Sequence, residues 1–163
     1  MALTRLAPRR TSQGDRREPL PRILYVEDED ANWRVTERFL RGRYRLSRAR
    51  NSDEAAALLS SEKYDLILLD IELSSSRHDG IEICKLLRGK SSNPDASDPR
   101  WRGHEAPIVF VTAYAARYSK EALLEAGADD VVTKPVDYTR LLLVSSRLIV
   151  RSVRGSPGPN RQA

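Results

Sequence analysis

The chain has 163 residues and a formal net charge of +5, and its apolar and charged fractions are ordinary for a soluble globular domain. That length allows one domain with its own core and leaves no room for a second output domain. No apolar stretch approaches the roughly 20 residues of a membrane span, and the N-terminus lacks the apolar core of a secretory signal. We therefore expect a cytoplasmic protein with no membrane partner.

The positive charge is concentrated at the two ends of the chain. Residues 1–22 hold six arginines against two acids, residues 151–163 hold three arginines and no acid, and the part between them is slightly negative. Both ends are rich in Arg, Pro, Gly and Ser, which is typical of solvated tails. We predict disordered basic tails at 1–21 and 154–163. Because neither end has interleaved aromatic residues or a reading helix, we predict no specific nucleic-acid binding.

Between the tails, short apolar runs alternate with amphipathic segments, a pattern that predicts βα units around a parallel sheet. In chain order we expect a strand at 23–26, a helix at about 31–41, a strand near 44–49, a helix from 52 to about 64, a strand at 66–69, a helix at about 80–87, a strand at 108–111, a helix at about 119–125, a strand at 131–133 and a helix at about 138–153. The connection at 89–106 is longer than the usual length of about 2 to 6 residues, which indicates an insertion or a mobile loop. Trp101 inside it either pins the loop to the body or offers a contact surface, and pinning is favoured.

Local signals mark helix ends and faces. Asp30 is the expected N-cap of the first helix, in which Val35 and Phe39 have the i, i+4 spacing of an amphipathic segment. Gly127 is typical of the residue that follows a helix C-terminus. Cys84, the lone cysteine, cannot form an internal disulfide and is expected to be a small core residue.

Polar residues follow four of the expected strands: Glu27 and Asp28, Asp70, Thr112, and Lys134. Because the carboxyl ends of parallel strands meet at one edge of the sheet, we expect these side chains to form one pocket. Three carboxylates that close repel one another and require a cation, and all-oxygen ligation suits Mg²⁺. Lys134 adds a second cationic group, and the Thr112 hydroxyl can donate to an oxyanion. This set predicts phosphoryl transfer onto an aspartate.

Each of these residues also has an ordinary structural explanation. An acid at a strand end is commonly a solvated turn residue or a cap, and Thr112 is commonly a β-branched strand residue. For any one residue alone the ordinary explanation is favoured. Their joint order along the chain favours the site.

Residues 23 to about 150 resemble the receiver domain of bacterial two-component response regulators. The resemblance rests on six segments in order: ILYVEDE at 23–29, DLILLD at 65–70, DG at 79–80, PIVFVTA at 107–113, GADD at 127–130 and TKP at 133–135. It implies an α/β fold, namely a doubly wound (βα)5 flavodoxin-like three-layer sandwich whose parallel sheet has the order 2-1-3-4-5. The receiver domain is expected at 22–153.

The resemblance also implies roles for the pocket residues. Asp70 is the expected phosphoacceptor, which assists its own phosphorylation and dephosphorylation without making the protein a classical enzyme. Thr112 is the expected switch hydroxyl, and Lys134 is the lysine expected to pair with the phosphoryl group. The expected Mg²⁺ ligands are Asp28, Asp70, the main-chain carbonyl of Glu72 and, through water, Glu27. The positions expected to tune the switch are Ala113, Tyr114, Val131 and Pro135, the last after a cis peptide bond.

Two features depart from the family's pattern. Val131 stands where the family commonly has Tyr or Phe, so the usual coupling between the threonine and an aromatic ring is not expected, and Tyr114 or Tyr118 are the candidates to replace it. The loop after Asp70 is longer than the family's. His78 in that loop is expected to be solvent-exposed rather than a metal ligand, because no second His or Cys lies near it in the sequence.

A receiver without an output domain acts by docking. The resemblance implies a sensor histidine kinase or phosphotransfer domain as phosphodonor, and a downstream protein target bound through the fourth helix, fifth strand and fifth helix. Leu143 and Val150, beside Arg147, add more apolar surface to the last helix than one buried stripe requires, so we expect an interaction or homodimer face there. Trp33, beside the acidic pair, either contacts the phosphodonor or packs on its own helix.

Three functions fit these residues. The first is a single-domain response regulator phosphorylated on Asp70, which the complete Asp-Thr-Lys set favours. The second is a receiver-fold adaptor or scaffold that docks without phosphorylation, which Val131 and the altered loop favour. The third is a haloacid-dehalogenase-like phosphatase, which ranks last because that family has a second aspartate where this chain has Glu72.

Overall fold

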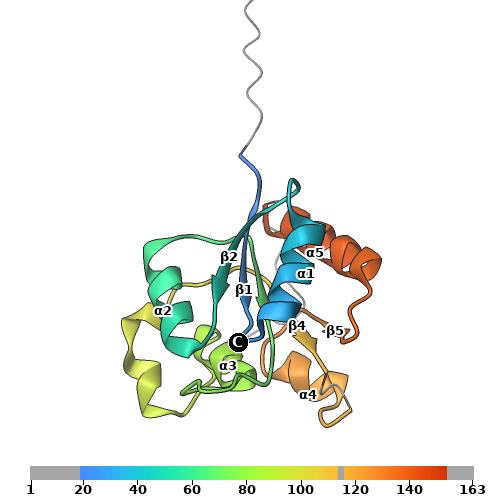
Figure 1. Ribbon diagram of the computed structural model, residues 1–163. Coiled ribbons are helices and arrows are strands. Elements are labelled where there is room, and N and C mark those ends of the chain that lie inside the picture. Colours follow the sequence, from blue (N-terminus) through green and yellow to red (C-terminus); the bar gives the residue numbers. More distant parts are fainter. Residues whose placement is uncertain (1–18, 114–115, 154–163) are drawn as a thin grey trace, which may run out of the picture.

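The computed structural model describes residues 19–113 and 116–153 (Figure 1). Tyr114 and nearly all of the two predicted tails lie outside the described residues. Strands and helices alternate in the order β1 (Arg22–Val26), α1 (Asp30–Leu40), β2 (Arg45–Ala49), α2 (Ser52–Ser61), β3 (Leu66–Leu69), α3 (Gly80–Leu87), β4 (Ile108–Thr112), α4 (Lys120–Glu125), β5 (Asp130–Thr133) and α5 (Tyr138–Val153), with two 3-10 helices, Pro94–Ser97 and Pro99–Trp101, before β4. Across both described ranges, no helix has the length and apolar character that a membrane crossing requires.

The five described strands run parallel in one sheet of order β2-β1-β3-β4-β5. One hydrophobic core lies between the sheet and α2, α3 and α4, and a second lies between the sheet and α1 and α5. Helices therefore cover both faces, and the sheet is the middle of three layers (Figure 1). The doubly wound fold predicted from the sequence is confirmed, and so is its strand order.

Strand β1 shows how the two cores position the acidic residues. Ile23 and Tyr25 belong to the core under α1 and α5, whereas Leu24 and Val26 belong to the other core. Successive side chains of a strand point to opposite faces of the sheet. Glu27 lies two residues beyond Tyr25, so it emerges at the edge of the sheet on the side of α1 and α5.

The long connection between α3 and β4 is pinned to the body. Its second 3-10 helix packs against α2, and the two segments lie side by side in Figure 1. The Trp101 side chain is buried in the core that α2 and α3 share. At the end of α3, Arg88 donates hydrogen bonds to the carbonyls of His104 and Ala106, at 3.1 and 2.8 Å. The pinning role predicted for Trp101 is confirmed.

Two predicted helix ends are wrong. Helix α1 already includes Asp30, and Glu29 occupies the N-cap position without a side-chain capping bond. Asp30 instead accepts a hydrogen bond from Arg48 Nη1 of β2 at 2.6 Å. The carboxylate that was expected to cap the helix is therefore paired with the neighbouring strand. Helix α2 ends at Ser61, and Tyr64 packs into the core beyond that end.

The apolar spacing on α1 does not mark its buried face. Val35 and Phe39 are 47% and 48% exposed, whereas Thr36 and Leu40 are buried against the sheet. The Thr36 hydroxyl lies 3.4 Å from the Tyr138 hydroxyl of α5, which gives a buried polar residue a partner. The ring of Phe39 stacks on Tyr138 with centroids 4.1 Å apart. The neighbouring helix α5 therefore decides which side of α1 is buried.

Candidate functional site

The carboxyl ends of β1, β3, β4 and β5 meet at one edge of the sheet. Backbone hydrogen bonds continue past the strands: the Asp70 amide donates to the Val26 carbonyl at 3.0 Å, and the Lys134 amide donates to the Thr112 carbonyl at 2.8 Å. The residues that follow the strands are thereby held in register with their neighbours. The predicted convergence of strand ends is present in the structure.

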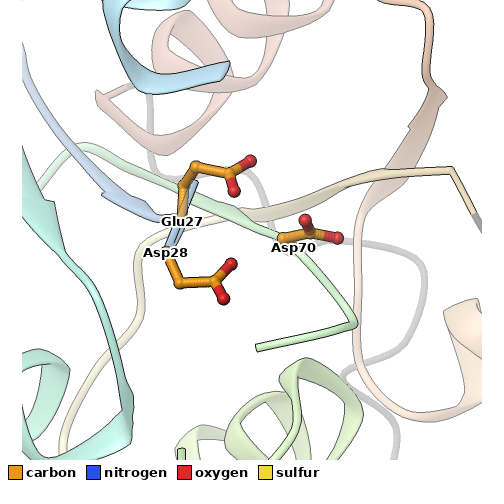
Figure 2. Close-up of side chains that lie close together, drawn as sticks. All are labelled: Glu27, Asp28 and Asp70. Atoms are coloured by element: carbon orange, nitrogen blue, oxygen red, sulfur yellow. The ribbon is translucent and has the colours of Figure 1, made fainter. Parts of the chain in front are cut away.

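Three carboxylates gather at this edge. One carboxylate oxygen from each of Glu27, Asp28 and Asp70 lies within 4.8 Å of the others, and Figure 2 shows Asp70 beside the acidic pair at the end of β1. Glu27 is fully buried and Asp70 is 6% exposed. Among the described residues, none donates a hydrogen bond to Asp70 Oδ1. A buried oxygen without a donor, in an all-oxygen cluster, fits a hard divalent cation such as Mg²⁺.

Lys134 compensates part of this negative charge. Its Nζ donates to Asp70 Oδ2 at 2.6 Å and to Glu27 Oε2 at 2.8 Å. Burial by itself lowers the pKa of Lys134, but the hydrogen bonds to Asp70 and Glu27 outweigh burial, and the pKa lies above its usual value. The ammonium group therefore stays charged at neutral pH. The bond from Lys134 to the exposed Pro135 is a cis peptide, as the resemblance implies.

Asp70 is less readily ionised than an ordinary aspartate. Burial raises the pKa of Asp70, although the hydrogen bond and the charge of Lys134 oppose that shift. The folded state therefore binds a proton at Asp70 more tightly than the unfolded state, so ionisation of Asp70 costs stability. The cost is absent below the usual aspartate pKa and complete above the raised pKa of the folded state. A cation bound beside Asp70 reduces this cost in stability.

Three groups outside the predicted set hold Glu27 and Asp28, the acidic pair that follows β1, in place. The Tyr25 hydroxyl donates to Glu27 Oε2 at 2.9 Å. Burial and then the charge of Glu27 raise the pKa of Tyr25, so the phenol keeps its proton and remains a donor. From β2, Arg48 donates to the carbonyls of Glu27 and Asp28, each at 2.8 Å. The Ser74 amide donates to Asp28 Oδ2 at 2.8 Å. Both carboxylates of the pair are thus oriented before any ligand arrives.

The other predicted pocket residues are placed as follows. Thr112 ends β4 and is buried, and Val131 in β5 is buried as well. Ala113 is exposed. Glu72 is also exposed, and its carboxylate pairs with Arg117 Nη1 at 3.4 Å across the loops after β3 and β4. The roles of these residues as ligand, switch or tuning positions stay predictions.

His78 is buried, contrary to the expectation that it is exposed. Its Nε2 lies 2.8 Å from Asp95 Oδ2 in the long connection before β4. Its carbonyl accepts a hydrogen bond from Ser76 Oγ at 2.7 Å, and Ser76 Oγ accepts one from the Ser52 amide at 2.9 Å. The extension after Asp70 is therefore packed between the inserted loop and the start of α2. This contact joins residues far apart in the chain, so local spacing could not indicate it.

Trp33 packs against the body of the protein. Its ring centroid lies 6.3 Å from the ring of Tyr25, and the Arg48 guanidinium lies 5.8 Å above it. The side chain is half-buried and belongs to the edge of the core under α1 and α5. Of the two roles predicted for Trp33, these contacts support packing.

The last helix exposes the apolar residues that its pattern predicts. Leu143 and Val150 are 68% and 49% exposed. Arg147, which lies between them in the sequence, pairs with Asp130 Oδ2 at 2.7 Å, and the same aspartate has Lys120 Nζ at 3.6 Å. Helix α5 is thereby tied to β5 and α4, with Leu143 and Val150 left exposed beside the ion pairs.

A family model for the response regulator receiver domain matches residues 23–145. The transcriptional regulatory protein ResD from Bacillus subtilis is 32% identical over 136 residues, which cover 83% of this chain and 50% of ResD. The chain therefore spans about half the length of this relative.

Solved structures agree with the family match. A putative response regulator from Chloroflexus aurantiacus is 28% identical with a TM-score of 0.66, over 82% of this chain and 100% of that one. The receiver domain of the sensor histidine kinase PA1611 from Pseudomonas aeruginosa, with a magnesium ion coordinated in its active-site cleft, is 29% identical with a TM-score of 0.65, over 80% of this chain and 98% of that one. Together with the matching fold and pocket, these similarities show that the chain belongs to the response regulator receiver domain family.

Proposed function

We propose that this chain is a response regulator of a two-component phosphorelay and accepts a phosphoryl group on Asp70. The observation that carries the proposal is the state of the Asp70 carboxylate: Lys134 holds Oδ2 at 2.6 Å, while Oδ1 has no donor among the described residues. A carboxylate with one oxygen beside the Lys134 ammonium and the other turned to the acidic cluster can accept a phosphoryl group while a cation is bound next to it. Asp28, Asp70 and the Glu72 carbonyl would hold Mg²⁺, with Glu27 acting through water. The magnesium in the PA1611 receiver domain supports that assignment.

The reaction follows from this arrangement. A carboxylate oxygen of Asp70 attacks the phosphorus of a phosphohistidine on a sensor histidine kinase or phosphotransfer domain. The O–P bond forms as the P–N bond breaks, and the departing imidazole nitrogen keeps the electron pair and takes a proton from water. Lys134 and the Thr112 hydroxyl stabilise charge on the phosphoryl oxygens. When bound, Mg²⁺ would neutralise part of the negative charge of the carboxylates and of the phosphoryl group.

Intact mass spectrometry after incubation with acetyl phosphate and Mg²⁺ tests the proposal. We expect wild-type protein to gain one phosphoryl group and Asp70→Asn to gain none. Asp53→Asn, at an exposed site on α2, is the matched control and is expected to behave as wild type. Wild-type protein that stays unmodified at saturating Mg²⁺ would overturn phosphoacceptor function and favour the adaptor that docks without phosphorylation.

We also propose that the phosphodonor docks on α1. Val35 and Phe39 are exposed apolar residues of this helix, and with Arg34 and Arg38 they line a hollow of the surface. Helix α1 starts at Asp30, shortly after Glu27 and Asp28, so a partner on α1 lies next to the pocket. Val35→Asp is expected to slow phosphorylation by a phosphodonor protein and to leave phosphorylation by acetyl phosphate unchanged. Equal slowing with both donors would instead indicate damage to the pocket.

The exposed side of α5 is the proposed site for a downstream target or a second copy of the chain. Leu143 and Val150 supply its apolar surface, and Arg147 supplies charge. Sedimentation that shows a strict monomer with and without phosphorylation would remove the homodimer and leave the downstream target.

A further inference from the structure

Glu27 accepts hydrogen bonds from Lys134, a member of the predicted pocket, and from donors outside that pocket. The residue is fully buried. Its Oε1 accepts the Glu29 amide at 3.0 Å, and its Oε2 accepts both Lys134 Nζ at 2.8 Å and the Tyr25 hydroxyl at 2.9 Å. Lys134 is shared with Asp70, because the same nitrogen also donates to Asp70 Oδ2. Among the described residues, Tyr25 is the one side-chain donor to Glu27 that Asp70 does not share.

Two further hydroxyl groups, from α1 and α5, lie on the far side of the Tyr25 hydroxyl from Glu27 as a hydrogen-bonded pair. Thr36 of α1 is 1% exposed, and interaction with its hydroxyl opposes part of the rise in the pKa of Tyr25, so it lies near the phenol oxygen. The Thr36 oxygen lies 3.4 Å from the Tyr138 hydroxyl at the start of α5. A phenol has one proton, and Tyr25 uses it on the carboxylate, so its oxygen accepts from Thr36. Either hydroxyl of the Thr36–Tyr138 pair can donate to the other, so Tyr138 can support a Thr36 hydroxyl that donates to Tyr25.

This polar chain crosses a core that is otherwise apolar. The other members of β1 are Ile23, Leu24 and Val26 together with Arg22 at its start, and the core under α1 and α5 is built mainly from aliphatic residues. An aliphatic side chain at position 25 would satisfy packing. A buried hydroxyl in such a core costs stability unless it has partners, and here each member of the chain has one.

We propose that the Tyr25 hydroxyl, supported by the Thr36–Tyr138 pair, is the positioning group that orients Glu27 in the cluster of three carboxylates shown in Figure 2. The inference rests on the proposed function and names a positioning residue for it. When a phosphoryl group is attached to Asp70, Lys134 gains another anionic partner. Tyr25 then remains as the side-chain donor dedicated to Glu27, so its contribution matters most when the pocket is occupied.

Tyr25→Phe is the direct test, because it removes one oxygen and keeps the ring. Tyr44→Phe is the matched control: Tyr44 is also buried, and its hydroxyl bonds Ser146 Oγ at 3.0 Å, away from the acidic cluster. Mg²⁺ affinity is measured by isothermal titration calorimetry, and the phosphorylation rate with acetyl phosphate is measured at saturating Mg²⁺. We expect Tyr25→Phe to bind Mg²⁺ about tenfold more weakly, with a smaller loss of rate at saturation. Tyr44→Phe is expected to match wild type in both.

The outcomes separate this inference from the proposed function. If wild-type protein neither binds Mg²⁺ nor becomes phosphorylated, both fail. If wild type does both and Tyr25→Phe has the Mg²⁺ affinity of Tyr44→Phe, the positioning role of Tyr25 is overturned and the proposed function stands. Should Tyr25→Phe not fold, Thr36→Val carries the test. It leaves Tyr25 in place but removes its donor, and an unchanged Mg²⁺ affinity in that variant would overturn the hydroxyl chain.

Discussion

Gly80→Ala is expected to lower the free energy of unfolding by about 3 kcal/mol and to slow phosphorylation of Asp70 by about tenfold to 100-fold. A Cβ at Gly80 would lie 2.0 Å from the Asp70 carbonyl oxygen and 2.8 Å from its carbonyl carbon. The Gly80 amide donates to the Ile71 carbonyl at 2.8 Å, so the first turn of α3 is tied to the same stretch of backbone. Relief of the clash requires the start of α3 and the backbone of Asp70 to move apart, which shifts the proposed phosphoacceptor relative to its pocket.

The reason for glycine at this position is space rather than backbone freedom. Alanine in the first turn of a helix would otherwise be favourable. Gly103→Ala is the matched control, because Gly103 has a positive φ of 77° and nothing within 4 Å of its Cβ position. We expect it to cost about 1 kcal/mol through backbone strain and to leave phosphorylation unchanged. Chemical denaturation gives the first quantity, and mass spectrometry over time gives the second. Wild-type phosphorylation kinetics in Gly80→Ala would contradict the expected displacement of Asp70.

The central part of the fold could be predicted because its signals are local. The buried run at 66–69 has apolar residues on both faces, as a central parallel strand requires, and it ends directly before Asp70. Helix α3 begins after Asp79, whose side chain accepts the Glu82 amide, and the predicted bounds of this helix are confirmed. Strand ends of this kind identify a shared sheet edge, so Glu27, Asp70 and Lys134 could be grouped before any geometry was known.

Features that depend on distant contacts could not be predicted. The buried side of α1 is set by α5, whose Tyr138 partners Thr36 and stacks on Phe39. The burial of His78 depends on Asp95 in the inserted loop. Tyr138 is 102 residues from Thr36, and Asp95 is separated from His78 by the whole of α3, so the hydrophobic periodicity of either segment gives no signal for these contacts.

The groups that orient Glu27 and Asp28 could be predicted from the sequence only in part. Tyr25 is two residues before Glu27 on a strand, so their shared face follows from the period of the strand. The role of Arg48 requires the register of β2, where Arg48 is the Cα partner of Tyr25. That register follows from strand pairing, and the motif at 23–29 carries no signal for it.

Lys134→Met is expected to lower the free energy of unfolding at neutral pH by about 3 to 5 kcal/mol, because it leaves two buried carboxylates without their shared cation. The pKa of Lys134 is raised in the folded state, so the stability that Lys134 contributes is fully present below the usual lysine pKa and is lost as the pH rises through the raised value. Neutral pH lies well within the first range. Lys120→Met, which removes a largely exposed partner of Asp130 at 3.6 Å, is the control and is expected to cost about 0.5 kcal/mol or less.

The stability that Lys134→Met loses should be partly restored by Mg²⁺ and by lower pH. With the ammonium absent, Mg²⁺ is the remaining cation that can offset repulsion between Glu27, Asp28 and Asp70, so Mg²⁺ should raise the melting temperature of the variant more than that of wild type. Burial already raises the pKa of Asp70, and loss of Lys134 removes the interaction that opposes the shift. The variant should therefore regain stability relative to wild type as the pH falls and Asp70 takes up a proton. Thermal unfolding over a pH series, with and without Mg²⁺, measures both effects. A variant whose deficit is constant across the series would show that Lys134 acts through packing and not through its charge.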